Sequence, residues 1–394
     1  MKESIFFIMK YPTCLKETLV RKFNGEMDSC VSLGYEVWYI EWNGREFLLK
    51  NRNSNIGIFL YKSHCIVSQS RYYHSLCFSE LYLAACKALK KQHFDYVYFR
   101  EMPLCPPAKN LFKIIDSSDT FFIYEIPTYI KSIGAESVKQ TNKMSLPRLI
   151  LSELSKIYQK GTLNYPDFFV VIGDDCGKII HNKPAVNISN GIDITSIPMK
   201  RTCTKDNTIN VLLLASMCYW HGYDRIIEGL KGYKGDQSIV LHFVGNAGDD
   251  SLNEWKKMVN NYELHDLVVF HGPVYGEELN QLIDSMDIAV GSLGLHRLNL
   301  SSASTMKSRE YMARGIPFIY AGEDPTIEEG FPYVLNVPDN EDPISISDLV
   351  NFANRMKSIY EVPAKMRNYA FNHFSWHHQM RKVFQELNEG RQVK

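Results

Sequence analysis

A loop rich in hydroxyl side chains, followed by a short helical pattern, holds the residues with the clearest chemical potential. The candidate residues are Ser302, Ser304, Thr305, Met306, Lys307 and Glu310. Hydroxyl residues just before a helix cap it and leave its first backbone amides for an anion. The carboxylate that follows on the helix can accept two hydrogen bonds from the vicinal hydroxyls of a ribose. This spacing suits a nucleotide-sugar donor, although an ordinary capped helix with a solvated glutamate fits the same pattern.

A second group of candidates lies between the apolar run 209–214 and a helical pattern that begins near residue 223. His221 and Arg225 are potential donors to phosphate oxygens. Gly222 permits close approach of the backbone to a ligand. The alternative is that Trp220 and Tyr223 pack the loop, while Arg225 pairs with a local acid.

A third segment ends a predicted strand at Gly272 and begins a helix near residue 277. Backbone groups from Phe270 to Gly272 can hydrogen-bond the edge of a base. A plain strand–turn–helix connection fits this segment equally well.

Polar residues also follow two apolar strands in the first half of the chain. Arg100 ends the run 96–100, and Glu125 and Thr128 lie near the end of the run 121–126. In α/β proteins the carboxyl ends of the strands face the ligand. Glu125 is therefore the candidate acid/base or hydroxyl-binding group, with capping of the next helix as the alternative.

The elements that must position these residues alternate along the whole chain. Apolar runs of strand length alternate with stretches of helical spacing, which predicts two doubly wound, Rossmann-like domains with parallel sheets that face a central cleft. The strands are expected at 5–9, 35–40, 55–61, 96–100, 121–126, 168–172, 186–189, 209–215, 239–244, 267–270, 288–290, 317–320 and 333–336. The helices are expected at 15–33, 76–91, 146–160, 223–231, 252–261 and 277–286, and in the segment 347–388.

The domain boundary is expected where the periodicity stops. Asn190-Gly191 marks a turn, and a polar stretch follows it before the pattern restarts at Ile209. This predicts one domain over 1–195 and a second domain over 196–394. The last helix is expected to pack back on the first domain.

Composition narrows the class of protein. The 394 residues carry no net charge, but residues 1–195 carry +5 and the remainder −5, an excess too small to predict nucleic-acid binding. Nine scattered cysteines without a Cys-x-x-Cys pair predict a reducing compartment and no structural zinc. No apolar run approaches the about 20 residues of a membrane span. We expect a cytoplasmic protein, with peripheral contact at the inner face of the membrane through the basic, amphipathic stretch 139–160 as a further option.

Taken together, these segments resemble retaining glycosyltransferases of the GT-B fold, family four, of the type that assembles polysaccharides and capsules. The matching blocks are Tyr98–Arg100, Tyr124–Tyr129, Asn190–Asp193, Trp220–Arg225, Phe270–Gly272 and Lys307–Pro317. No single block is specific, but their order and spacing are.

The resemblance implies roles for individual residues. Glu310 matches the second glutamate of the family's Glu–seven residues–Glu motif, which holds the ribose, and Ser302 replaces the first. The amides of Ser304, Thr305 and Met306 fall where the family binds diphosphate. Ser216 and His221 stand where the family has an arginine and a lysine, so Arg225 or Lys307 is expected to substitute for them.

The resemblance also implies an acceptor-binding domain over 1–195, a nucleotide-sugar-binding domain over 196–394 and an activity. It predicts a retaining, metal-independent hexosyltransferase without a cofactor, which moves a sugar from a UDP- or GDP-sugar to a glycan or lipid-linked acceptor in surface polysaccharide synthesis. Glu125 and Glu310 are its expected catalytic residues. The alternatives are a nucleotide-sugar epimerase on the same fold and a degenerate binding subunit without activity.

Overall fold

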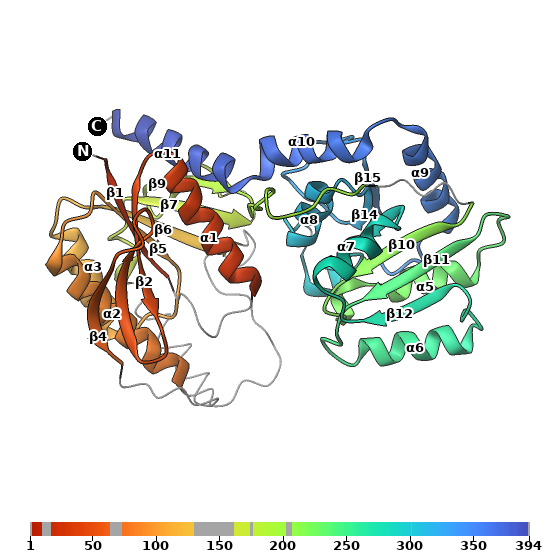
Figure 1. Ribbon diagram of the computed structural model, residues 1–394, viewed down its shortest axis with the longest axis horizontal. Helices are drawn as coiled ribbons and strands as arrows, with labels where there is room; N and C mark the ends of the chain where they lie inside the picture. Colours follow the sequence, from red (N-terminus) through yellow and green to blue (C-terminus); the bar gives the residue numbers. More distant parts are fainter. Residues whose placement is uncertain are drawn as a thin grey trace. The chain divides into compact units, whose positions relative to one another are not determined.

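The computed structural model describes residues 2–9, 17–63, 73–129, 161–173, 176–201, 207–300 and 302–392. The chain divides into two compact units (Figure 1). The first contains residues 1–191 and 376–394, and the second contains residues 192–375. The sequence boundary was expected after residue 195, and the last helix belongs to the first unit.

The first unit is built on a nine-stranded sheet of order β4-β3-β2-β1-β5-β6-β7-β9-β8. Its strands are β1 (Ser4–Ile8), β2 (Glu36–Trp42), β3 (Glu46–Asn51), β4 (Gly57–Lys62), β5 (Tyr96–Arg100), β6 (Phe121–Tyr129), β7 (Phe168–Gly173), β8 (Ile179–Ile180) and β9 (Lys183–Ile188). The pairs from β2 through β1, β5, β6 and β7 to β9 are parallel. The outer pairs β2–β3, β3–β4 and β8–β9 are antiparallel.

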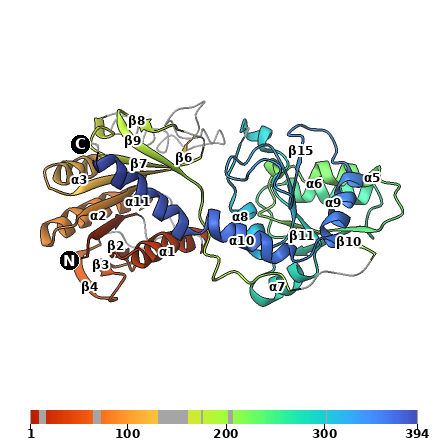
Figure 2. The ribbon, with the colours of Figure 1, turned by 90° about the horizontal axis from the view of Figure 1, so that it is seen from above.

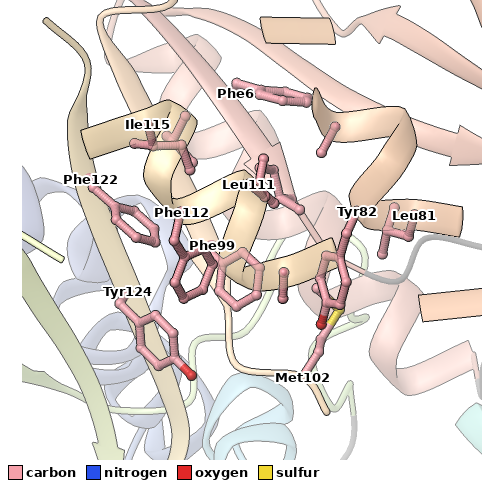
Figure 3. Packing of buried hydrophobic residues seen from close by; sticks show 14 of the residues in the cluster. Phe6, Leu81, Tyr82, Phe99, Met102, Leu111, Phe112, Ile115, Phe122 and Tyr124 are labelled. Carbon is pink, nitrogen blue, oxygen red and sulfur yellow. The ribbon is translucent and has the colours of Figure 1, made fainter. Parts of the chain in front are cut away.

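Helices cover both faces of this sheet, as its nearly continuous apolar strands require. On one face α2 (Tyr73–Lys91) and α3 (Pro106–Asp116) enclose a core rich in aromatic rings (Figure 3). Within that core the Phe112 ring meets the Phe99 and Phe122 rings edge-on at a centroid distance of 5.0 Å. On the other face lie α1 (Glu17–Ser32) and α11 (Trp376–Gln392), which pack side by side (Figure 2).

The second unit is built on a six-stranded parallel sheet of order β12-β11-β10-β13-β14-β15. Its strands are β10 (Ile209–Leu214), β11 (Ile239–Val244), β12 (Val268–Gly272), β13 (Ile288–Val290), β14 (Phe318–Ala321) and β15 (Val334–Val337). Helices α5 (Asp224–Lys231), α6 (Ser251–Asn261) and α9 (Ile346–Ser358) pack on one face. Helices α7 (Gly276–Asp284), α8 (Met306–Arg314) and α10 (Val362–Phe374) pack on the other.

Most predicted elements are present, and the differences have local causes. Helix α3 and strands β3 and β8 were not expected, and the first sheet is not wholly parallel, because β3 and β8 add antiparallel hairpin pairs. The helix predicted over 146–160 lies outside the described residues, as does the rest of the basic stretch 139–160.

Candidate functional site

The order in which the chain adds strands to the second sheet reverses at β10. The chain first adds β11 and β12 on one side of β10, and then adds β13 on its other side. Such a switch point leaves a crevice at the carboxyl ends of the strands. Two short 3-10 helices border it: η1 (Tyr219–His221) after β10 and η2 (Leu295–Leu298) after β13. The amide of Leu293 donates to the carbonyl of His221 at 2.9 Å and joins the two loops.

The loops are also joined through Arg297 on η2. Its guanidinium donates to the carbonyl of Tyr219 at 2.9 Å and to both carboxylate oxygens of Asp224 at 2.8 and 2.7 Å. The loop after β10 is therefore fixed against the loop after β13 by charge-assisted bonds.

Lys307 is held in this crevice by two side chains that are far from it in sequence. Its Nζ lies 3.1 Å from Nδ1 of His221 and 3.2 Å from Oη of Tyr223. Nε2 of His221 lies 3.1 Å from the carbonyl oxygen of Ser216. This carbonyl accepts a hydrogen bond from Nε2–H, so the ring is protonated on Nε2. Nδ1 then carries a lone pair, which accepts a hydrogen bond from the ammonium group of Lys307. His221 and Lys307, both sequence candidates, are thus brought together.

The surroundings make this an unusual cation. Loss of water around Lys307, between the rings of Trp220 and Tyr223, lowers the pKa of its amine to about 7. Burial, followed by the positive charge of Lys307, lowers the pKa of His221 to about 2, which keeps the imidazole neutral. Among the described residues no carboxylate pairs with Lys307.

Helix α8 positions Lys307 in its first turn. Thr305 is the N-cap, and its Oγ1 accepts from the amide of Ser308 at 3.3 Å. The hydroxyl of Ser304 accepts a hydrogen bond from the buried guanidinium of Arg309, which also pairs with Asp324 at 3.1 Å. The loop before α8 is therefore held by hydrogen bonds, and the first helical amides lie in the same turn of α8 as Lys307.

The other candidates on this loop are less enclosed. Met306 is an exposed side chain at the first helical position, and Ser302 forms a backbone bridge with Glu323, in the loop after β14. Glu310 lies three residues after Lys307, on the same face of α8. Its Oε1 accepts from Nε of Arg314 at 2.9 Å, and a third of its side chain is exposed.

Arg225 has a different role from the predicted phosphate contact. Its side chain is buried, and its guanidinium donates to the carbonyls of Leu293, Asp342 and Pro338 and to the side chain of Asn340. A guanidinium so fully engaged with protein acceptors holds the loops after β13 and β15 together. The alternative in the sequence, pairing with a local acid, is replaced by pairing with backbone carbonyls.

Gly222 and Ser216 also serve packing. Gly222 has φ +65°, and a Cβ there would lie 2.8 Å from the carbonyl carbon of Leu293. The close approach predicted for a ligand is thus made by the neighbouring loop. A Cβ on Gly248 would lie 2.9 Å from Oγ of Ser216, so this hydroxyl points to the loop after β11.

The end of β12 lies farther along the same edge. The side chain of Phe270 packs on Phe243, with ring centroids 4.9 Å apart, which leaves only its backbone for a ligand. The carbonyl of Gly272 accepts from the amide of Gly245 at 2.8 Å. The predicted base contact through these backbone groups stays a prediction.

In the first unit, Glu125 lies in a buried ionic cluster rather than at an open site. Its Oε1 accepts from Nζ of Lys22 at 3.1 Å and from Nη1 of Arg100, so Arg100 and Glu125, which were separate sequence candidates, are bonded to each other. Lys22 also lies 3.5 Å from Glu26. Both carboxyl side chains are fully buried.

The two carboxyl groups of this cluster titrate in opposite directions. Burial, with repulsion from Glu125, raises the pKa of Glu26 to about 8. Burial also opposes ionisation of Glu125, but Arg100 and Lys22 outweigh it and lower its pKa. An ionised, cation-bound and enclosed Glu125 is not placed to exchange a proton with a substrate, so the predicted acid/base role is not supported by this geometry. The side chain of Thr128 lies outside the described residues.

Sequence reasoning missed three members of these clusters. Tyr223 was expected only to pack, yet its hydroxyl holds Lys307 and donates to the carbonyl of Val290 at 3.4 Å. Lys22 and Glu26 had not been singled out, although their i, i+4 spacing on a helix is a readable sign of an ion pair. In the described ranges there is no group of three metal-binding side chains, and no helix is long and apolar enough to cross a membrane.

Comparison with known proteins gives the fold. No protein-family model matches the chain, and no curated protein is similar to it in sequence. A glycosyltransferase from Rickettsia africae has a similar structure, with a TM-score of 0.61 and 15% identity over 98% of either chain. Sucrose-phosphate synthase from Thermosynechococcus elongatus also has a similar structure, with a TM-score of 0.63 and 12% sequence identity over 100% of both chains. Anabaena HepE, in complex with UDP, has a TM-score of 0.52 and 12% sequence identity over 99% of this chain and 100% of the HepE chain. The expected GT-B fold of two Rossmann-like units is confirmed.

Proposed function

We propose that this chain is a glycosyltransferase that moves a sugar from a nucleotide-diphosphate donor to a glycan or lipid-linked acceptor. The reaction retains the configuration at the anomeric carbon and uses no metal or other cofactor. The observation that carries this function is the ammonium group of Lys307, held by neutral partners at the switch point of the second sheet.

Lys307 favours an anionic ligand. An ammonium group has three N–H donors, and His221 and Tyr223 accept two of them. A partly desolvated cation without a carboxylate partner is costly, and a phosphate oxygen would satisfy both its charge and its third donor. The first amides of α8 add the positive end of a helix dipole at the same place.

The rest of the donor fits around this phosphate position. Glu310, three residues farther along the same face of α8, is the proposed partner of the ribose hydroxyls. The UDP complex of the similarly folded HepE supports a nucleoside diphosphate as the donor's leaving group. In this chain we assign the donor to the second unit, residues 192–375, and the acceptor to the first.

The proposed chemistry is attack from the face on which the diphosphate leaves. The bond from the anomeric carbon to the phosphate oxygen breaks, and its electron pair goes to the diphosphate. The acceptor hydroxyl forms the new bond on the same face, and the departing phosphate oxygen takes its proton. Lys307 and the α8 amides stabilise the charge that develops on the diphosphate.

The cellular role follows the sequence resemblance. The blocks 307–317 and 124–129 are similar to those of enzymes that assemble surface polysaccharides, which supports work on a glycan or lipid-linked acceptor. We place the protein in the cytoplasm, with peripheral contact at the membrane. The predicted cleft between the two domains also stays a prediction.

The test is a thermal-shift panel of nucleoside diphosphates and nucleotide sugars, with and without EDTA. A ligand that binds the folded state raises the melting temperature by mass action. We expect UDP or GDP to stabilise the wild type in EDTA, and Lys307→Met to weaken that nucleotide about 10- to 100-fold, the loss of one charge-assisted hydrogen bond. The matched control is Lys257→Met, which removes an exposed lysine from α6 and should bind as the wild type does.

Three outcomes would contradict the function. No shift with any nucleotide would favour the degenerate binding subunit. Conversion of a nucleotide sugar to its epimer without acceptor would favour the epimerase. A shift that EDTA abolishes would overturn metal independence.

A further inference from the structure

A fully buried arginine on α8 connects two loops of the second unit. The side chain of Arg309 is 0% exposed, and its Nη2 donates to three oxygens. These are the hydroxyl of Ser304, Oδ1 of Asp324 at 3.1 Å and the hydroxyl of Thr326. Ser304 directly precedes the N-cap of α8, whereas Asp324 and Thr326 belong to the loop after β14. One guanidinium nitrogen therefore bonds to both loops.

The loop after β14 presents its oxygens on a turn with internal hydrogen bonds. Oδ1 of Asp324 accepts from the amide of Thr326 at 3.2 Å and from its hydroxyl at 2.5 Å. The two loops also meet through their main chains, since the amide of Ala303 donates to the carbonyl of Glu323 at 2.9 Å. The acceptors around Arg309 are thus held in place by their own contacts.

An aromatic ring holds the guanidinium as well. Cζ of Arg309 lies 3.8 Å from the centroid of the Phe374 ring, which is buried at the end of α10. A guanidinium stacks favourably on an aromatic face, and more so where both are shielded from water. The side chain of Arg309 therefore has little freedom to turn away from Ser304.

The buried ion pair contributes little to the stability of the fold. Taking two charges out of water costs more than their attraction returns unless their remaining donors and acceptors are satisfied. Nε and Nη1 of Arg309 and Oδ2 of Asp324 are buried without a hydrogen-bond partner among the residues that the structure describes. Apolar side chains of similar volume often stabilise such a position equally well. What the pair adds is geometry rather than stability.

The segment whose geometry it sets belongs to the proposed phosphate site. The backbone amides of Ser304, Thr305 and Met306 are the proposed partners of the diphosphate, and Lys307 follows them directly. An amide binds a phosphate oxygen only when its N–H points at that oxygen. Fixing a loop in one conformation before the ligand arrives also removes an entropic cost of binding. By holding Ser304, Arg309 fixes the segment that carries these amides.

We propose that Arg309 is a positioning residue of the donor site and that, together with Asp324, it holds the loop before α8 in the conformation that binds the donor diphosphate. This inference rests on the proposed function, since it concerns the phosphate end of the same ligand. Arg309 is enclosed, so it acts through Ser304 rather than on the ligand itself.

The test is a double-mutant cycle between the ion pair and Ser304, with the affinity for UDP and for GDP measured by titration calorimetry. Arg309→Met combined with Asp324→Asn removes both charges at once, so that no buried charge is left unpaired. We expect this variant and Ser304→Ala each to bind the nucleotide about tenfold more weakly, the loss of one charge-assisted hydrogen bond. With all three substitutions together the loss should stay near tenfold, because they break the same connection.

A variant that keeps the ion pair serves if the apolar replacement does not fold. Thr326→Val removes one oxygen partner of Arg309 from the loop after β14, to which the proposed function assigns no ligand contact. It should weaken nucleotide binding about threefold, through the loss of one hydrogen bond. Wild-type affinity in Thr326→Val would then overturn the proposal.

The matched control is Lys357→Met combined with Asp287→Asn. It removes the 3.2 Å ion pair between α9 and the residue before β13, at the amino end of that strand, and should leave nucleotide affinity unchanged. An equal loss of affinity in this control, wild-type affinity in the Arg309 variant, or a cycle in which the two losses add would overturn the positioning role, while Lys307→Met still tests the donor site. No binding of UDP or GDP to the wild type would overturn both proposals.

Discussion

At the scale of single residues, Lys307 connects the proposed donor site to pH. Its amine has a pKa of about 7, whereas His221 stays neutral and burial raises the pKa of the Cys218 thiol. Lys307 is thus the group of this cluster that changes charge between pH 7 and 9. Because only the ammonium form pairs with phosphate, nucleoside diphosphate affinity should fall as pH rises above about 7, by up to tenfold per pH unit.

Calorimetric titrations at pH 7, 8 and 9 measure this fall, in a range where a phosphate with a second pKa of about 6 is already mostly ionised. Lys307→Arg keeps its charge throughout and should flatten the profile. The same slope in that variant and in the wild type would show that another group titrates.

A second residue, Glu26, makes the stability of the first unit depend on pH. Its pKa of about 8 in the folded protein lies above its usual value of 4.5, because burial and Glu125 disfavour the charged form. A raised carboxyl pKa gives stability that is fully present below about pH 4.5 and is lost as pH rises through about 8.

The wild type should therefore lose unfolding free energy between pH 5 and 8, at most on the order of 1.4 kcal/mol per pH unit. Glu26→Gln should remove this slope, as denaturant unfolding at several pH values would show. Glu389→Gln, which changes an exposed carboxylate on α11, should retain it. An unchanged slope in Glu26→Gln would mean that Glu26 is ionised throughout.

Residue types were easier to predict than their partners. His221 and Lys307 could be singled out from sequence because His221 follows a predicted strand beside Gly222, and Lys307 begins a helical pattern after a hydroxyl-rich loop. Their contact joins the loop after β10 to the first turn of α8, 86 residues apart in sequence, which no local pattern encodes. Glu125 shows the opposite error, since a polar residue near a strand end was read as open to the cleft, whereas Lys22 from α1 reaches and neutralises it.

At the scale of elements, the parallel strands were predictable because they are buried on both faces and so read as unbroken apolar runs. Helix α3 was missed because Pro106 and Pro107 resemble a break, yet proline at the first helical positions needs no amide partner. Strand β3 was missed because it alternates buried and half-buried residues in an antiparallel hairpin and has no continuous apolar run.

The loops between elements explain the remaining differences at the site. A glycine such as Gly222 indicates a close approach, but the sequence does not say what approaches it. Here the backbone of Leu293 and Gly294 does so, which makes the glycine part of the joint between the loops after β10 and β13. Arg225 belongs to the same joint through the carbonyl of Leu293. The proposed donor site therefore depends on loop packing that only the folded structure reveals.

At the scale of the whole molecule, the chain returns to its first unit after completing the second. The polar break after Asn190 predicted where the chain leaves the first unit, because the hydrophobic periodicity stops there. The return at Trp376 has no such break, because α10 ends and α11 begins with Ser375 alone between them. The core of the first unit is nevertheless completed by Met380, Val383, Phe384 and Leu387 of α11.

This return predicts which unit a mutation in the last helix will destabilise. The ring of Phe384 is buried, with its centroid 4.4 Å from that of Tyr35 and 5.9 Å from that of Tyr96. Phe384→Ala should cost the first unit about 3–5 kcal/mol, although residue 384 follows the whole of the second unit in sequence. Scanning calorimetry should show a lower transition for the first unit, while the transition that a nucleoside diphosphate raises stays in place.

The matched variant is Phe352→Ala, which empties a similarly buried position on α9 in the second unit. It should lower the transition that responds to the nucleotide and leave the other unchanged. If Phe384→Ala instead lowered both transitions equally, the two units would unfold as one, and α11 would stabilise the molecule as a whole rather than the first unit.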